Sequence, residues 1–436
     1  MKMFGAIVIS VIVGGCSSEQ RSCPDSKPGA RMLALSRETP NTSGTLSLFD
    51  VGPAPCRADL IALVPSATSV GGAAWADRGG VLATVDRDHV RVFDAHLGAH
   101  QIAETAGSAR TIAFDPTGRW LVWIDGNVRA WSTDPGAAPI DAGASLSDFD
   151  ITPSMFEPGS DRLVVHGPGV VRVVDLAATG GPTSHDWTPW INALASTQWS
   201  PAGRWLVATS EGNGSMLIDT TDPSAATTAI GGAFAWSPSG ARLAIDKDGG
   251  TSILDVSGGA VVVGRAFPGA VQAQWLDASR FVALMGTSLM VGDADSGATR
   301  TLVDGVHEWG AVAPNVVAYT SAPDLWRWVL VDTGASGDIG ACDAPSFSPD
   351  GRYAVCFGEN ITLVADTTLG TRRELPTPPH RTLYNIAVQW RADSSRAWID
   401  VEGADLVLDP AAPTVTPPPD ADAVTSPFGW EPLPTP

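Results

Sequence analysis

Lysine is nearly absent from this sequence. Its 436 residues contain only Lys2, Lys27 and Lys247, so a Schiff-base or phosphate-binding lysine has almost no candidates. Basic residues are scarce altogether, because 27 Lys and Arg stand against 47 Asp and Glu and give a formal net charge of −20. Proteins that bind nucleic acid present a basic surface to the phosphates. The composition therefore argues against a nucleic-acid partner.

Long helical and long hydrophobic stretches are also missing. The chain has 46 Gly and 34 Pro, too many for a helix-rich fold, since both residues interrupt helices. With 44% hydrophobic and 17% charged residues it is nevertheless a folded chain. The uncharged apolar stretch near the start, Met3 to Gly15, is too short to cross a hydrocarbon core of ~30 Å as a helix.

The first residues predict export. Lys2 and the short apolar stretch after it are typical of a signal peptide, and the stretch ends in Gly14-Gly15-Cys16-Ser17. Here the sequence resembles a bacterial lipoprotein precursor, in which small residues precede a cysteine that carries lipid after cleavage. The resemblance implies a signal peptide over residues 1–15, a lipid anchor on Cys16 and a tether over residues 16–29. Ser17 implies an outer-membrane lipoprotein, on the periplasmic face or the cell surface; an ordinary secretory signal with a chance cysteine is the alternative.

Four cysteines remain after Cys16, namely Cys23, Cys56, Cys342 and Cys356. An even number in an exported protein favours two disulfides. The segment Ser348-Pro-Asp-Gly351 has a type I turn signature, and a hairpin centred on it brings Cys342 and Cys356 almost opposite each other. Cys23 with Cys56 then follows by elimination and would fasten the tether to the body. Unbonded cysteines are the alternative.

The sequence repeats itself about every forty residues. Each unit has an aromatic anchor, a short turn that often reads Ser-Pro-x-Gly-Arg, and an apolar segment that ends in aspartate. The anchors are Trp75, Phe114, Phe156, Trp199, Trp236, Trp275, Phe347 and Trp390, with a degenerate copy at Val312. The aspartates are Asp94, Asp175, Asp219, Asp255, Asp293, Asp332, Asp366 and Asp409, and Thr133 stands in their place after Phe114. This pattern predicts four short strands per unit, with each aspartate capping the next turn through its side chain.

The turn motif also carries a resemblance to a known class of repeat. Phe347 to Arg352 reads Phe-Ser-Pro-Asp-Gly-Arg, and Trp199 to Arg204 nearly repeats it. These segments resemble the WD40-like, TolB-type (PD40) propeller repeats, over roughly residues 66 to 412. The resemblance implies an all-β fold, a β-propeller of four-stranded blades. It says little about activity, because one fold hosts many functions.

Both ends of the chain bear on how the propeller closes. Residues 30–65 hold three strand-like segments with no aromatic strand before them, and Trp430-Glu-Pro near the end echoes Trp199-Ser-Pro. We therefore predict a propeller over residues 30–412, then a Pro-rich connection and a closing strand within residues 413–436 that completes the first blade and the ring. Ten units are counted, and since propellers typically have four to eight blades, seven to ten blades are compatible. A disordered Pro-rich end is the alternative.

Motifs for catalysis and metal binding are absent or incomplete. Neither a Gly-x-Ser-x-Gly elbow nor a His-Glu-x-x-His motif occurs. His96 and His100 have metal-ligand spacing but flank a Gly-rich hairpin. The segments starting at Asp246 and Asp293 hint at calcium loops but lack the full set of oxygen ligands, so turn chemistry explains them. We predict no catalytic residue, no metal site and no cofactor.

The aromatic residues fall into two classes. Seven tryptophans at or near anchor positions should pack between blades: Trp75, Trp199, Trp236, Trp275, Trp309, Trp390 and Trp430. Two inter-blade connections carry the candidate partner-binding residues His185, Trp187 and Trp190, and His380, Arg381 and Tyr384. Exposed aromatics with His and Arg are typical of interaction surfaces. The alternative is that these rings fold back onto neighbouring blades; in a ten-unit ring the two connections would lie on opposite sides.

Taken together, the sequence predicts a lipid-anchored cell-envelope propeller that is not an enzyme. Its partners would be the membrane, through lipid on Cys16, and an envelope protein or polymer bound by loops on one face. One alternative is a propeller enzyme of the quinoprotein or glycan-acting type, although the Trp and Asp-box motifs of those repeats are missing. The other is a subunit of an outer-membrane assembly complex.

Overall fold

The protein, seen in a computed structural model, is built almost entirely of β-strands. Among the residues described, the 3₁₀ helix η1 (Pro153–Met155) is the only helical element. The described residues are 31–37, 44–50, 56–62, 72–76, 81–85, 89–94, 100–106, 112–133, 137–144, 153–167, 170–178, 181–187, 194–210, 214–222, 224, 227–323, 325–358, 361–376, 386–401, 404–412, 414–416 and 424–430.

These strands form ten antiparallel sheets, called blades A to J in chain order, of which nine have four strands and one has three. Blade A contains β1 (Arg31–Arg37), β2 (Gly44–Asp50), β3 (Cys56–Ala62) and β39 (Val424–Trp430); blade B contains β4 (Gly72–Trp75), β5 (Val81–Val85), β6 (His89–Asp94) and β7 (His100–Ala106); blade C contains β8 (Ile112–Phe114), β9 (Trp120–Ile124), β10 (Asn127–Ser132) and β11 (Ile140–Ala144).

The middle of the chain supplies four further blades. Blade D contains β12 (Arg162–Gly167), β13 (Val170–Asp175) and β14 (Thr183–Trp187); blade E contains β15 (Leu194–Trp199), β16 (Trp205–Ser210), β17 (Gly214–Asp219) and β18 (Thr228–Gly231); blade F contains β19 (Phe234–Trp236), β20 (Arg242–Lys247), β21 (Gly250–Asp255) and β22 (Val262–Pro268); blade G contains β23 (Ala270–Trp275), β24 (Arg280–Met285), β25 (Ser288–Asp293) and β26 (Thr299–Val303).

Three blades follow toward the C-terminus. Blade H contains β27 (Glu308–Ala313), β28 (Val316–Thr320), β29 (Leu325–Leu330) and β30 (Ser336–Ala341); blade I contains β31 (Ser346–Phe347), β32 (Tyr353–Gly358), β33 (Ile361–Asp366) and β34 (Thr371–Pro376); blade J contains β35 (Ile386–Trp390), β36 (Ala397–Val401), β37 (Ala404–Asp409) and β38 (Thr414–Thr416).

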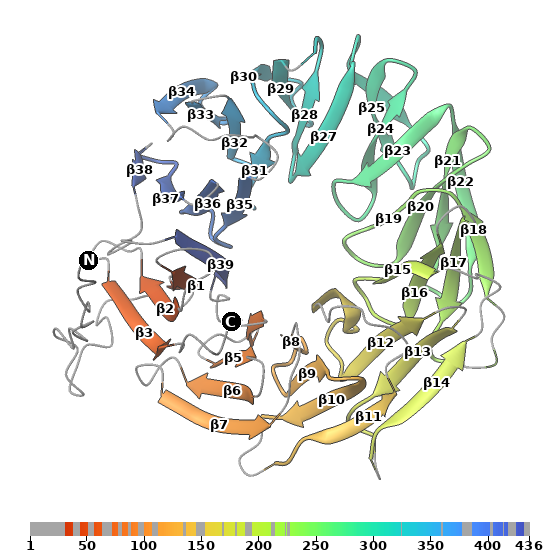
Figure 1. The fold of residues 1–436 in the computed structure, drawn as a ribbon. Helices are drawn as coiled ribbons and strands as arrows, with labels where there is room; N and C mark the ends of the chain where they lie inside the picture. Colours follow the sequence, from red (N-terminus) through yellow and green to blue (C-terminus); the bar gives the residue numbers. More distant parts are fainter. Residues whose placement is uncertain are drawn as a thin grey trace, which may run out of the picture.

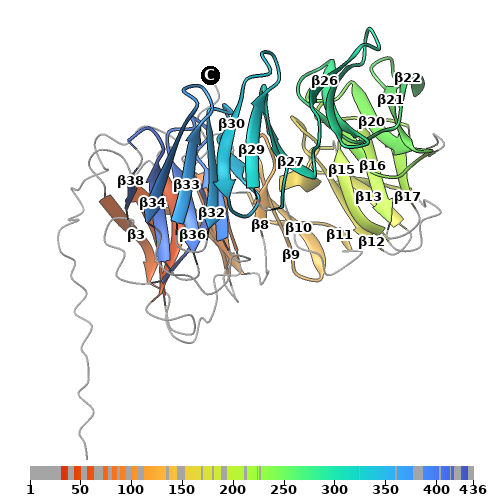
Figure 2. The same cartoon turned by 90° about the horizontal axis from the view of Figure 1, so that it is seen from above.

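The ten blades are arranged radially around a common centre, which is the architecture of a β-propeller (Figure 1). The first strand of a blade, such as β23 or β27, lies on the inside, and the fourth lies at the rim. Seen from the side, the blades stand next to one another with their strands running between the two faces of the assembly (Figure 2). The predicted all-β propeller fold is confirmed.

The strand boundaries follow the repeat found in the sequence. The inner strands β19 and β23 end at the aromatic anchors Trp236 and Trp275, and the third strands β21 and β25 end at Asp255 and Asp293. Turn residues follow these strands, as in Ser237-Pro-Ser-Gly240 after β19, because Pro cannot continue the ladder and Gly supplies the turn conformation. The degenerate unit at Val312 also forms a complete four-stranded blade.

The hydrophobic core lies between the blades. Each apolar cluster joins neighbouring sheets, as where Ala244 and Ile253 of blade F pack with Phe281 and Met290 of blade G. Phe267 of blade F meets Phe281 edge to face, with 4.8 Å between ring centroids. Full burial of one such ring contributes roughly 1.5–3 kcal/mol. A blade therefore hides its apolar faces only against its neighbours, as expected of a repeat protein.

The last strand of the chain completes the first blade. Strand β39 pairs antiparallel with β1, with Met32 opposite Trp430 and Arg37 opposite Val424. It takes the inner position of the blade, so the sheet order is β3-β2-β1-β39. Strand β39 therefore lies where a strand from the C-terminal segment is expected, and closure of the ring stays a prediction.

Blade D departs from the predicted four strands. Its anchor Phe156 makes only an isolated bridge with Leu163, and the residues just before it form η1. Pro153 lies where the inner strand would run, and a proline has no N–H to donate to a sheet ladder. The expectation of an inner strand in this unit is therefore wrong.

The rim of the molecule consists of edge strands that are interrupted or blunted. Seven of the ten outermost strands carry a register shift against their neighbour, for example between Ser215 and Met216 in blade E and between Trp326 and Arg327 in blade H. The three regular ones are β14, which exposes His185 and Asp186, β34, which exposes two arginines and a glutamate, and β38, which has three residues. Bulges, charges and short length all discourage pairing with another chain.

Candidate functional site

The two ends of the blades have different structures, and we name them by their connections. The turn face carries the turns between first and second strands and between third and fourth strands, such as residues 237–241 and 256–261 of blade F. The hairpin face carries the hairpins between second and third strands, such as residues 247–250, and the connections to the next blade, such as Gly269. The repeat motif lies on the turn face.

The Ser-Pro-x-Gly turn of the motif holds neighbouring blades together. In blade F, the Oγ of Ser237 accepts a hydrogen bond from the Arg242 N–H at 3.1 Å. Gly240 has a φ of +68°, and a Cβ on it would lie 2.3 Å from the backbone nitrogen of Ala202 in blade E. Only glycine fits this position, because the conformation and the space both exclude a side chain.

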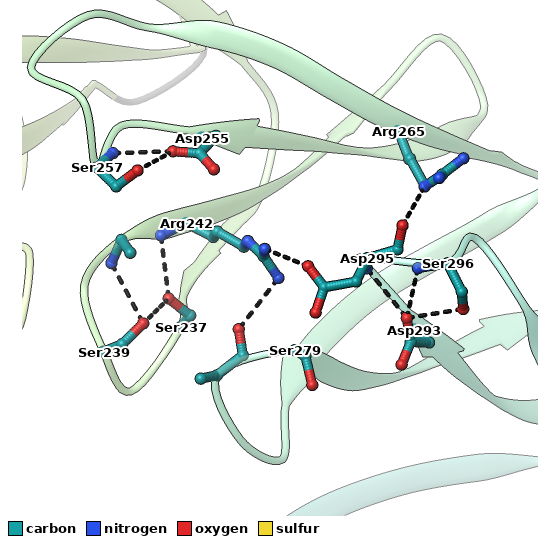
Figure 3. Close-up of polar contacts among 12 residues, drawn as sticks. Ser237, Ser239, Arg242, Asp255, Ser257, Arg265, Ser279, Asp293, Asp295 and Ser296 are labelled. Carbon is teal, nitrogen blue, oxygen red and sulfur yellow. Dashed lines mark hydrogen bonds and ion pairs between the residues drawn. The ribbon is translucent and has the colours of Figure 1, made fainter.

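The arginine of the motif reaches into the following blade. Arg242 forms an ion pair with Asp295 of blade G and donates to the carbonyl of Ala278 in the same blade, as Figure 3 shows. Arg280 of blade G likewise pairs with Asp332 of blade H, with 2.6 Å between Nη1 and Oδ1. These guanidinium groups bridge the junctions between blades F, G and H.

Six of the eight predicted aspartates cap the following turns, namely Asp175, Asp219, Asp255, Asp293, Asp366 and Asp409. Asp332 pairs with Arg280 instead, and Asp94 has no described side chain. The Oδ1 of Asp255 accepts hydrogen bonds from the N–H of Ser257 at 2.9 Å and from its hydroxyl at 2.6 Å (Figure 3). Hydrogen bonds from the Ser257 side chain and backbone lower the pKa of Asp255. Asp293, in one of the segments that hinted at calcium, accepts bonds from Ser296 in the same way. The polar groups of the turn face are thus used within the fold.

The indoles of the aromatic anchors also tie each blade to the preceding one. Trp199 donates from Nε1 to the carbonyl of Met155 at 2.9 Å, and Trp275 donates to that of Ala235 at 2.9 Å. In each pair the acceptor immediately precedes the anchor of the preceding blade. The prediction that the anchor tryptophans pack between blades is confirmed for Trp199, Trp236 and Trp275.

A different polar cluster lies at the hairpin face and spans three blades; we call it the inner cluster. It consists of Asp246 and Thr251 of blade F, Gln272 on the inner strand β23, and Trp309 on the inner strand β27. Asp246 accepts from the hydroxyl of Thr251 through Oδ1 at 3.0 Å and from the N–H of Gln272 through Oδ2 at 2.6 Å. The Oε1 of Gln272 accepts from the indole of Trp309 at 3.2 Å.

The backbone of the inner cluster is strained at its centre. Gln272 has a φ of +58°, a conformation that side-chain-bearing residues rarely adopt, and it lies within a bulge between Val271 and Gln274. Strain and bulges of this kind occur often where a side chain is re-aimed at a functional site. Gln272 is exposed and Trp309 partly exposed, so both side chains are accessible to a ligand.

Sequence reasoning found only parts of the inner cluster. Asp246 was assigned to turn chemistry and Trp309 to packing between blades, while Gln272 was not singled out. No local sequence pattern marks Gln272. Its backbone N–H bonds to Asp246, 26 residues earlier, and its side chain accepts a bond from Trp309, 37 residues later. A tertiary structure was needed to bring the three side chains together.

Of the predicted partner-binding residues, two are described, and they lie in different environments. His185 lies exposed on β14, in the outer strand of blade D. The prediction that Trp187 lies in an exposed connection is wrong: it ends the same strand, is 4% exposed and packs in the core between blades C, D and E. An apolar residue that ends a strand can be covered by a neighbouring blade, and the indole of Trp187 is covered in this way. Trp190, His380, Arg381 and Tyr384 lie outside the described residues.

One of the two predicted disulfides is present. Cys342 and Cys356 are bonded, with Cα atoms 5.9 Å apart, between the connection that leaves blade H and the second strand of blade I. This confirms the pairing argued from the turn at Ser348. Cys16 and Cys23 lie outside the described residues, and Cys56 begins β3 without a described side chain, so the second pairing stays a prediction.

No group of three His, Cys, Asp or Glu side chains is close enough to hold a metal ion within the described part of the chain. No helix in the same residues is long and apolar enough to span a membrane.

Comparisons with known proteins are consistent with the fold. No protein family matches the sequence, and no curated protein does. The structure is similar to a crystal structure of "the eukaryotic initiation factor", with a TM-score of 0.57 and 11% identity over 93% of this chain and 100% of that chain. The WD40 domain of SCAP from fission yeast (TM-score 0.42, 12% identity, 77% of this chain and 93% of that chain) and Chaetomium thermophilum Sqt1 (0.41, 15%, 75% and 91%) are also similar. At such identities the likeness concerns the fold alone.

Proposed function

We propose that this protein is a lipid-anchored β-propeller of the cell envelope that binds an envelope protein or polymer without chemically changing it. The inner cluster is the observation that carries this proposal. Asp246, Gln272 and Trp309 come from three blades and are fixed by hydrogen bonds on one face. Carboxylate, amide and indole groups held in this way are suited to binding and orienting a ligand.

The use of polar groups on the two faces supports the same role. On the turn face, Arg242, Asp255 and Asp293 hold turns and blade junctions, so their chemistry serves the fold. On the hairpin face, Gln272 is exposed and has a positive φ of +58°, which side-chain-bearing residues rarely adopt. A rigid disc with an adaptable face is a common design for binding proteins.

Attachment to the membrane is proposed to occur through lipid on Cys16, with the body outside the cytoplasm. Cys16→Ser in the full chain is expected to abolish labelling by a palmitate analogue and to move the protein from the membrane fraction to the soluble fraction. Unchanged labelling would contradict the anchor while leaving the propeller and its binding role intact.

The binding role is tested by gentle purification of the full chain from membranes after chemical crosslinking. We expect the same envelope component to be recovered with the native protein and lost with Trp309→Ala. Recovery of a whole outer-membrane assembly complex would favour the subunit alternative. A quinone-type absorbance in the purified protein, or turnover of a glycan, would favour the enzyme alternative and contradict the proposal.

A further inference from the structure

The inner cluster has features that define the class of ligand it can take. The indole N–H of Trp309 is already bonded to Gln272, so the ring presents only its apolar surfaces to a ligand. The side-chain N–H₂ of Gln272 supplies donors, and the carboxylate of Asp246 supplies acceptors. An apolar ring beside planar amide and carboxylate groups matches a sugar, which has an apolar C–H face and a rim of hydroxyls.

The charges around the cluster disfavour an anionic ligand. At this end of the strands, Lys247 and Asp248 follow Asp246, and Glu308 precedes Trp309. Three carboxylates therefore face one ammonium group, and no arginine lies on these segments to form the bidentate bonds that phosphates and carboxylates require. An anionic ligand would be repelled, whereas a neutral polyhydroxylated one would not.

The geometry at Gln272 shows that the site is built. Its N–H, bonded to Asp246 at 2.6 Å, holds the residue at a φ of +58°, and its carbonyl oxygen Oε1 meets Trp309 at 3.2 Å. The connection Gly269 donates its N–H to the carbonyl of Gly249 at 3.0 Å and so fixes the hairpin that bears Asp246. The side chains are held in place before a ligand arrives, which lowers the entropic cost of binding.

We propose that the inner cluster is a binding site for a neutral glycan chain, with one sugar ring stacked on Trp309 and its hydroxyls bonded to Gln272 and Asp246. This inference rests on the proposed binding function and names its ligand class. The polymer would thread along the inner strands β23 and β27, whose free edges face the common centre (Figure 1).

Calorimetric titration of the full chain, in a detergent without a sugar head group, tests this site with cellotetraose, maltotetraose and chitotetraose as probes. We expect at least one of them to bind with a Kd of about 1 mM or tighter. Trp309→Ala should weaken that affinity at least tenfold. Gln272→Gly should weaken it about fivefold without lowering the Tm, because glycine accepts the positive φ that glutamine resists.

The matched control is Trp390→Ala. Trp390 also lies on an inner strand, at the opposite end of β35 in blade J, and donates its indole N–H to the Ser346 hydroxyl oxygen at 3.1 Å, so its loss should cost stability and leave sugar affinity unchanged. The inference is overturned if none of the three sugars binds, or if neither Trp309→Ala nor Gln272→Gly weakens binding. If crosslinking recovers a protein partner but none of the sugars binds, the glycan site is contradicted. The proposed binding function is then still supported.

Discussion

At the scale of single residues, the repeat motif is a set of joints between blades. The serine caps its own turn, the glycine touches the preceding blade, the arginine reaches the following one, and the aromatic ring donates backward. A motif with this job is expected in every unit of a propeller, whatever the protein binds. That is why it predicts the fold so well and the function so poorly.

Gly240 provides the sharpest test of this joint. Gly240→Ala is expected to destabilise the protein by about 2 kcal/mol or more, since the new Cβ would lie 2.3 Å from the Ala202 nitrogen in the preceding blade. The control is Gly286→Ala, where φ is also positive at +61° but nothing lies within 4 Å, so only about 1 kcal/mol of backbone strain is added. Denaturant unfolding measures the free energy of unfolding of both variants. Equal decreases would contradict the role of Gly240 in the contact between blades E and F.

Asp277 predicts how stability depends on pH. Burial opposes its ionisation, but the N–H groups of Ser279 and Arg280 and the Arg280 side chain lower the pKa of Asp277 to about 2 from 3.8. Because its pKa falls on folding, the stabilisation is present above pH 3.8 and is lost as the pH falls toward 2. Asp277→Asn should flatten the dependence of Tm on pH in this window. If the dependence of Tm on pH in this range does not change with the substitution, other carboxylates dominate it.

At the scale of strands and turns, the sequence predicted what local chemistry decides. Aromatic anchors and terminal aspartates recur at nearly fixed spacing, so the ends of β19 and β21 could be placed in advance. The inner strand of blade D was predicted wrongly because the spacing was weighed above Pro153, which cannot join a ladder. Trp187 was misplaced because burial by a neighbouring blade leaves no local pattern. The inner cluster escaped prediction for the same reason, as its members lie in different blades.

The disulfide acts at the level of elements, since it fastens the connection after blade H to strand β32. Cys342→Ala with Cys356→Ala should lower the free energy of unfolding by about 3 kcal/mol, the expected value for a bond that closes a loop of this size. Blade H has Asn315 and Val316 where blades C, E and I have Gly-Arg, and its junction with blade I carries the disulfide. An unchanged unfolding midpoint would contradict this role.

At the scale of the whole molecule, the pairing of β1 with β39 leads us to infer that the ring is closed. Removing residues 424–436 should lower the Tm by roughly 5 °C or more, because the inner edge of blade A would lose its partner strand. Removing residues 431–436 alone leaves β39 in place and should leave the Tm unchanged. Equal melting of the two truncated proteins would show that the last strand does not hold the ring.

The irregular outer strands would affect how copies of the protein meet on a membrane. The proposed lipid anchor would hold copies on one membrane, where they would meet sideways at far higher local density than in free solution and their outermost strands would be first to touch. Outer strands that are irregular, charged or very short offer no continuous edge on which two copies could pair their backbones. Crowded neighbours would then separate again, and the two broad faces would stay open to whatever they capture.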